Sequence, residues 1–205
     1  MIVYYHGGDG IKRINSFYWL VLGISCFLIT QPLLRINILK YLQTFSEYQI
    51  LFMNPLKGAF FLAFTAGLFE ETGRFFFKMV FKSDNNYFQA ILFGLGHAVA
   101  EIFFIFYILY YSGIHPDIYS FIERISATLI HIGLTVIIWN GFLRNKKFSY
   151  YIVAIFLHTS VNMFPYLINS YVSSIVIIET LLFAISCAFL YYAIYSKKYY
   201  SREDA

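Results

Sequence analysis

Ionisable and amide side chains recur in this sequence within stretches that are otherwise long and apolar. They are Glu70, Glu71, Arg74, His97, Glu101, Glu123, Arg124, His131, His158 and Asn162. If these stretches cross a bilayer, each charged side chain at its centre costs about 2.5–3.5 kcal/mol. Groups of this kind do not face lipid, so we expect them to face one another or a water-filled cavity.

Three pairs of these residues share a spacing of four. The pairs are Glu70 with Arg74, His97 with Glu101, and His158 with Asn162. Residues four apart lie one turn apart on the same face of an α-helix. Each pair therefore predicts a narrow polar stripe on an apolar helix.

Imidazole and carboxylate groups together form the donor set of a divalent metal site. Imidazole nitrogen suits zinc, and a carboxylate either completes the ligand set or acts as a base. A catalytic zinc keeps one position for water and lowers the pKa of that water to about 7. We therefore expect a divalent metal, zinc in the first instance, held by His97, His131 and His158.

A metal-free site is the alternative. Glu70 or Glu71, together with His97, would activate water directly, and His158 and Asn162 would donate hydrogen bonds to the oxyanion of the intermediate. The HExxH signature of soluble zinc peptidases is absent from the sequence. The sequence thus leaves both forms of chemistry open, with the same five residues as candidate catalytic groups.

Two further residues have the spacing of supporting groups. Arg74 lies within reach of both Glu70 and Glu71, and pairing with either carboxylate would hold it ionised. Glu101 lies one turn from His97, so we expect it to orient that imidazole.

Glu123 and Arg124 are adjacent and lie nearer the end of their apolar stretch than the histidines do. We expect them to pair with each other or with a neighbouring helix. That role is structural.

The elements that position these residues follow from hydropathy. Charged residues make up 13% of the 205 residues, against about 25% in soluble domains. A bilayer-spanning helix needs about 20 apolar residues. Six segments qualify: 16–34, 58–80, 87–111, 119–142, 149–168 and 171–195. We predict an all-α, polytopic transmembrane bundle, a single domain over residues 1–205, with its motif-bearing core at about 58–165.

The predicted spans place their ionisable residues at one depth. Glu70, His97, His131 and His158 each fall nine to eleven residues from the same end of the bundle, which is about 15 Å at 1.5 Å per residue. Unrelated structural roles would scatter such residues along the helices. A common layer indicates a shared site.

Basic residues predict the orientation. One set of loops holds Lys12, Arg13, Lys78, Lys82, Arg144, Lys146, Lys147, Lys197, Lys198 and Arg202, and the other holds only Arg35, Lys40 and Lys57. Basic loops face the cytoplasm, so we expect a multi-pass protein of the cell membrane with both termini inside. The net charge of +4 thus reflects topology and indicates no nucleic-acid partner. The segment 35–57 is expected to be an outside loop, or a re-entrant or interfacial helix.

The motifs resemble a known pattern when they are taken in order. Residues 70–74 read EExxR, residues 94–101 read GxGHxxxE, and residues 158–162 read HxxxN, with Glu123, Arg124 and His131 between them. Over residues 58–165 this resembles the YhfC family of intramembrane metallopeptidases. That family is related to the CAAX prenyl endopeptidases and bacteriocin-processing (CPBP, or Abi) proteins. In the CAAX branch the arginine usually comes one residue later, so the spacing here favours the YhfC branch.

The resemblance implies an activity and roles for particular residues. It implies hydrolysis of a peptide bond in a membrane-associated substrate, with Glu70 and Glu71 activating the attacking water and His97 acting with them. His158 and Asn162 match the last motif, which is implicated in oxyanion stabilisation or metal contact.

Two other classes of function are compatible with intramembrane carboxylates and histidines. A proton- or ion-coupled transporter uses such chains as relays, but it would predict inverted repeats and broken spans, and no repeat is visible. A non-catalytic scaffold or immunity-type protein would retain the fold without turnover.

Overall fold

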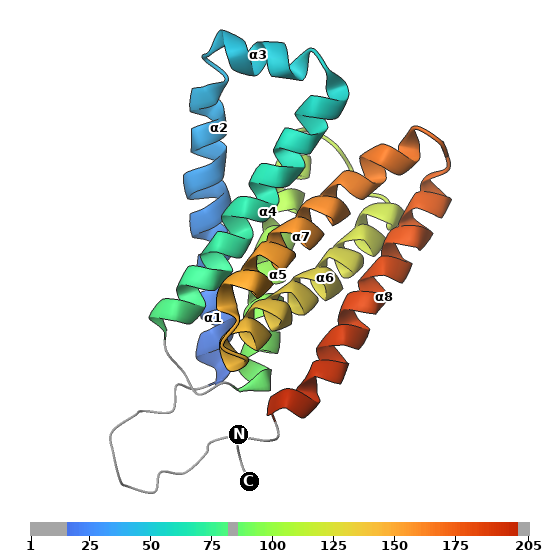
Figure 1. The fold of residues 1–205 in the computed structure, drawn as a ribbon. Coiled ribbons are helices and arrows are strands. Elements are labelled where there is room, and N and C mark those ends of the chain that lie inside the picture. The colour runs from blue at the N-terminus through green and yellow to red at the C-terminus, as the bar shows by residue number, and fades with distance from the viewer. Residues whose placement is uncertain (1–15, 82–85, 201–205) are drawn as a thin grey trace, which may run out of the picture.

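The computed structural model describes residues 16–81 and 86–200, and these residues are helical without a strand. The helices are α1 (Ser16–Leu28), the π-helical turn η1 (Ile29–Arg35), α2 (Ile36–Leu42), α3 (Ser46–Phe52), α4 (Pro55–Val80), α5 (Tyr87–Tyr111), α6 (Ile118–Leu143), α7 (Lys147–Asn169) and α8 (Ile175–Tyr200). They form one bundle, and α1 begins at the end of the bundle where α8 finishes (Figure 1). The all-α prediction is confirmed.

In the part of the chain that the structure describes, five helices are long and apolar enough to cross a membrane, or six if the bent pair α3–α4 counts as one span. The chain is therefore a multi-pass membrane protein. Helix α4 alone is too polar because it carries five charged residues, Lys57, Glu70, Glu71, Arg74 and Lys78. Four residues used to predict the orientation, Lys12, Arg13, Lys82 and Arg202, lie outside the described residues. The cytoplasmic placement of the termini therefore stays a prediction.

The first span is longer than its sequence indicated. The helix continues through η1 and α2, so the span runs from Phe17 to Leu42 and not to residue 34. Pro32 lies inside the π-helical turn, where the widened turn accommodates a residue that cannot donate a backbone hydrogen bond. Arg35 therefore belongs to a transmembrane helix and not to an outside loop.

Beyond α2, segment 35–57 contains the short helix α3 and the first residues of α4. Helix α3 lies across one end of the bundle and joins α2 to α4 (Figure 1), and it meets α4 at a bend of 112°. Segment 35–57 is therefore helical along most of its length and is not an exposed loop. The two ends of the bundle are therefore the α3 end and the opposite end.

Side-chain caps start three of the long helices. Asn54 accepts a hydrogen bond from the backbone N–H of Lys57 (3.1 Å), Asn86 from that of Phe88 (2.8 Å), and Asp117 from that of Ser120 (2.9 Å). Each bond satisfies an N–H group that the first helical turn leaves unpaired. The caps thus set where α4, α5 and α6 begin.

Two glycines bring α1 and α5 into backbone contact. A Cβ atom at Gly23 would overlap the carbonyl oxygen of Phe93, and one at Gly96 would overlap that of Leu20. Small residues permit such close approach between membrane helices, where van der Waals packing drives association. This contact holds His97, which follows Gly96, against the first span.

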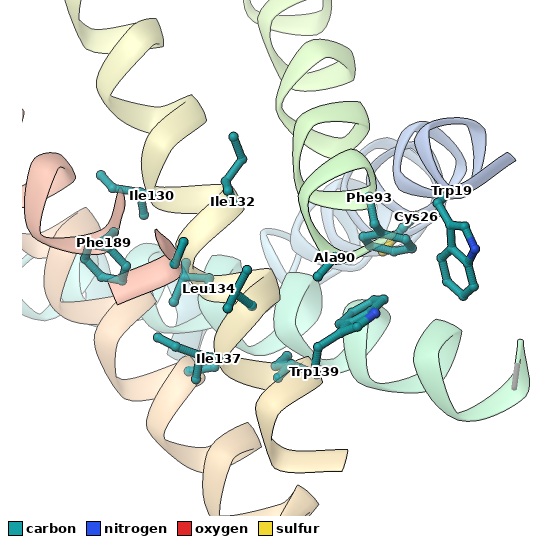
Figure 2. Packing of buried hydrophobic residues seen from close by; sticks show 14 of the residues in the cluster. Trp19, Cys26, Ala90, Phe93, Ile130, Ile132, Leu134, Ile137, Trp139 and Phe189 are labelled. Carbon is teal, nitrogen blue, oxygen red and sulfur yellow. The ribbon is translucent and has the colours of Figure 1, made fainter. Parts of the chain in front are cut away.

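An aromatic cluster fills the half of the bundle opposite α3. Figure 2 shows its members on three helices, Trp19 of α1, Phe93 of α5 and Trp139 of α6. The ring centroids of Phe93 and Trp139 are 5.1 Å apart, and those of Trp19 and Trp139 are 6.0 Å apart. The Lys78 ammonium lies 5.3 Å from the Trp139 ring and 5.8 Å from the Trp19 ring, within the range of cation–π attraction.

Candidate active site and metal centre

The four residues that were expected at one depth lie together in the structure. Glu70 comes from α4, His97 from α5, His131 from α6 and His158 from α7, and all four are buried. The ring centroids of His97 and His131 are 5.0 Å apart, and those of His131 and His158 are 5.6 Å apart. Four helices thus form a single polar layer inside an apolar bundle.

Glu70 is held through both carboxylate oxygens. Its Oε1 accepts a hydrogen bond from the side-chain amide of Gln31. Its Oε2 lies 2.9 Å from Nε2 of His97 and 3.5 Å from Nη2 of Arg74. Three neighbours therefore fix the orientation of this carboxylate, and the predicted pairing of Arg74 with Glu70 is observed.

Glu71 lies behind this layer. Its side chain is fully buried. Its Oε1 accepts hydrogen bonds from Nδ1 of His158, at 2.6 Å, and from the guanidinium of Arg74. Its Oε2 has no hydrogen-bond partner among the described residues. Glu71 therefore orients His158 and Arg74, whereas Glu70 faces the open part of the site.

His131 is bonded on both ring nitrogens. Its Nε2 contacts the Glu101 carboxylate, and its Nδ1 lies 2.7 Å from Nη2 of Arg74. The expectation that Glu101 orients His97 is wrong, because Glu101 contacts His131 and, within residues 16–81 and 86–200, Nδ1 of His97 has no hydrogen-bond partner. Residues one turn apart share a helix face, but each of these two reaches a partner on another helix.

Arg124 extends this chain of contacts. Its Nη1 lies 3.0 Å from Glu101 and its Nη2 lies 2.5 Å from Glu123. The expected pairing of Glu123 with Arg124, and of this pair with a neighbouring helix, is therefore confirmed. Through Glu101 the pair supports His131.

The donor atoms of Glu70, His131 and His158 fit a metal in their spacing. One ligand atom from each lies within 4.8 Å of the others. Oε2 of Glu70 is 3.8 Å from Nδ1 of His131 and 3.8 Å from Nε2 of His158. Tetrahedral zinc ligands at 2.0–2.1 Å lie about 3.3 Å apart, so a small inward movement would close the group on an ion.

The hydrogen bonds of the His131 and His158 imidazoles are also compatible with a bound metal ion, with one exception. Nδ1 of His158 faces Glu71, which leaves Nε2 with its lone pair toward Glu70, as in a carboxylate–histidine–metal arrangement. Glu101 bonds Nε2 of His131 in the same way, which leaves Nδ1 of His131 as the nitrogen that could bind an ion. Arg74, however, occupies Nδ1 of His131, so an ion bound there would require the guanidinium to move. His97, which the sequence indicated as a ligand, is not a member of this group, and that role stays a prediction.

A cavity of about 430 Å³ adjoins the polar layer. Glu70, His131 and His158 line its inner part, and its other lining residues on α4, α5, α6 and α7 lie on the α3 side of that layer. Side-chain exposure rises along it from 5% at Glu70 to 19% at Glu101 and 45% at Glu123. The cavity therefore extends from the site toward the α3 end.

Asn162 lines this cavity one turn beyond His158. Its side chain is exposed and has no hydrogen-bond partner among the described residues. The site also contains two residues that the sequence analysis missed, Gln31 and Arg35, which both line the cavity. They are four residues apart, like the other polar pairs. Extending the first predicted span beyond residue 34 would therefore have revealed them as a pair on one helix face.

Comparison with known proteins agrees with the motifs. The YhfC intramembrane metalloprotease family matches residues 10–112 and 117–182. No curated protein and no solved structure matches the chain. The family match covers most of the chain and includes each helix that contributes to the polar layer. This chain belongs to the YhfC intramembrane metalloprotease family.

Proposed function

We propose that this protein is an intramembrane metallopeptidase that hydrolyses a peptide bond in a membrane-associated substrate. Glu70, His131 and His158 hold a divalent metal, zinc in the first instance. The observation that carries this proposal is the convergence of three buried donor atoms, from three helices, on the wall of a cavity. Two histidines and a glutamate are a known ligand set for catalytic zinc.

The protein groups around the ligands have separate tasks. A bound zinc would polarise a carbonyl and lower the pKa of its water. Glu71 and Glu101 fix the orientation and tautomer of His158 and His131, so that each presents a lone pair to the site. Asn162 lies in the cavity with its amide unused, which suits a donor to the oxyanion of the intermediate.

The cavity supports access from the α3 end. Its lining residues on α4, α5, α6 and α7 lie on that side of the polar layer, whereas the aromatic cluster around Trp139 fills the opposite side. Water and a peptide segment therefore reach Glu70 from the α3 end. If the termini are cytoplasmic, as the loop charges predict, that end faces away from the cytoplasm.

A metal-free peptidase is the second candidate, and one contact favours it. Arg74 already occupies Nδ1 of His131, and His97 lies 2.9 Å from Glu70. In that mechanism the Glu70–His97 pair activates water directly. His158, protonated on both ring nitrogens, then donates from Nε2 to the oxyanion.

Substitution of Glu70 by Gln tests the proposal. Gln keeps the size of the side chain but is neither a base nor an anionic ligand, so we expect proteolysis to fall at least about 100-fold. The measurement is quantitative mass spectrometry of new peptide termini in membrane proteins of cells that express each variant. Glu47→Gln is the matched control, because Glu47 is an exposed glutamate on α3. Unchanged cleavage in Glu70→Gln would exclude Glu70 as a base or a metal ligand in the reaction.

The zinc content of the purified protein separates the two mechanisms. We expect about one zinc per chain in the wild type, loss of that zinc in His158→Ala, and its retention in His97→Ala, because His97 lies outside the ligand group. Cleavage that persists in a zinc-free, chelator-treated protein would support the metal-free site. Loss of zinc in His97→Ala would restore the ligand set first predicted from the sequence.

A further inference from the structure

Gln31 joins two charged residues of the site. Its side chain is buried, with 6% exposed. Its amide nitrogen donates to Oε1 of Glu70, and its amide oxygen accepts from Nη1 of Arg35 at 3.0 Å. A single neutral side chain thus uses both of its polar ends, one on a carboxylate and one on a guanidinium.

The chemistry of the two partners determines which way the amide points. A guanidinium can only donate hydrogen bonds, and an ionised carboxylate can only accept them. The oxygen of Gln31 must therefore face Arg35, and its nitrogen must face Glu70. The amide cannot flip without placing donor against donor and acceptor against acceptor, so its orientation is unique.

The π-helical turn η1 brings this pair to α4. Turns of this kind occur mostly as single insertions in α-helices, frequently at functional sites. Arg35, one turn beyond Gln31, donates from Nη2 to the carbonyl oxygen of Leu62 (2.8 Å) and from Nε to the hydroxyl of Thr65 (3.2 Å). Leu62, Thr65 and Glu70 all belong to α4. Arg35 therefore anchors Gln31 to the helix that carries the carboxylate.

We propose that Gln31, oriented by Arg35, is a positioning residue for Glu70 and thereby sets the metal affinity of the site. Because Gln31 holds Oε1 of Glu70, Oε2 of Glu70 remains directed at Nδ1 of His131 and Nε2 of His158. This inference rests on the proposed function, because it concerns the ligand role of Glu70. Outer partners of metal ligands typically contribute 10–100-fold in metal affinity.

Two substitutions separate the hydrogen bond from the space that the side chain fills. Gln31→Leu keeps the approximate volume and removes both polar ends. Gln31→Asn keeps the amide but is one methylene shorter, so it cannot reach both partners. Thr30→Val is the matched control, because Thr30 is the adjacent buried residue and, among the residues that the structure describes, its hydroxyl bonds only to backbone carbonyls of α1.

The experiment is competition for Zn²⁺ between a chelator and the full-length protein in detergent, with the visible spectrum of bound Co²⁺ as a second readout. We expect Zn²⁺ affinity to fall 10–100-fold in both Gln31 variants, with a changed Co²⁺ spectrum, and to change less than twofold in Thr30→Val. Thermal unfolding of the metal-free proteins checks the fold. If Gln31→Leu does not fold, Gln31→Asn decides the question.

The outcomes distinguish this inference from the proposed function. If the wild type binds Zn²⁺ and a folded Gln31 variant binds it within twofold of the wild type, the inference is overturned and the metallopeptidase proposal stands. A wild type that binds no Zn²⁺ overturns the metal-dependent proposal and, with it, the role of Gln31.

Discussion

The two halves of the bundle differ in what fills them. Between the polar layer and the end opposite α3, the aromatic rings of Trp19, Phe93 and Trp139 pack with 0% exposure. Between the same layer and the α3 end, the helices enclose a cavity of about 430 Å³ lined in part by Glu101 and Arg124. The same helices thus form a closed half and an open half.

The difference shows how a membrane bundle keeps charged groups in place. The closed half supplies van der Waals contact, which is the main source of helix association in lipid, and excludes water from one side of the site. The open half has less of this contact, because a cavity lies beside Glu70. Close packing and access are therefore assigned to opposite sides of one layer, and each can be changed separately.

The largest expected effect is on the closed half. Trp139→Ala removes a fully buried indole that contacts two aromatic neighbours, so we expect the free energy of unfolding to fall by about 3–5 kcal/mol. Phe104→Ala is the matched change in the open half, where the ring already borders a cavity, and we expect a clearly smaller loss. Both are measured by denaturant unfolding in detergent. Equal losses would remove the distinction between the halves.

Filling the cavity should affect activity and not stability. Ala127 lines the cavity on α6, so Ala127→Trp obstructs it, and we expect cleavage to fall about tenfold or more because the substrate is displaced from Glu70. Zinc content should not change. Ile125→Trp introduces the same ring on the exposed face of α6 and should cleave normally. If both variants cleave like the wild type, the cavity is not the route to the site.

The smallest effect concerns the cap of α6 at the α3 end. Hydrogen bonds from the backbone N–H and hydroxyl of Ser120 lower the pKa of Asp117 below its usual 3.8. A carboxyl with a lowered folded-state pKa stabilises the fold above its unfolded pKa, and this contribution is lost as the pH falls through the folded pKa. We expect Asp117→Ala to lower the Tm slightly at pH 7, and we expect this difference from the wild type to become smaller well below pH 3.8.

Asp117→Asn is the control for that measurement. Asn is an equally good cap but carries no charge, so its Tm difference from Asp117→Ala should be the same at both pH values. A wild-type advantage that persists undiminished at low pH would show that the charge of Asp117 is not involved.

Much of the fold and part of the site could be predicted from the sequence. The six apolar segments were visible from hydropathy, and the common depth of Glu70, His97, His131 and His158 followed from helical rise alone. The cost of burying such groups in lipid made their convergence predictable. Residues at 70–74, 94–101 and 158–162 then indicated the family.

The partners within the site could not be predicted, because they depend on how helices are rotated against each other. Spacing placed Glu101 on the face of His97 but did not reveal that it reaches His131 on α6. Likewise, nothing in the sequence separates Glu70 from Glu71, although one lines the cavity and the other lies behind it. Gln31 lies inside the predicted first span, 16–34, but it was missed because it is uncharged and its partner four residues on, Arg35, was assigned to the following loop.

The backbone contact between α1 and α5 has a mechanical consequence. At Gly23 and Gly96 the backbones of α1 and α5 meet so closely that a methyl group would overlap a carbonyl oxygen, and no side chain at these two points can absorb sliding or rotation. We expect these two helices to move together, and with them His97 on α5 and Gln31 in the turn that follows α1. We therefore expect any motion that admits a bulky substrate to come mainly from the other helices, while Gln31 and His97 keep their positions relative to each other.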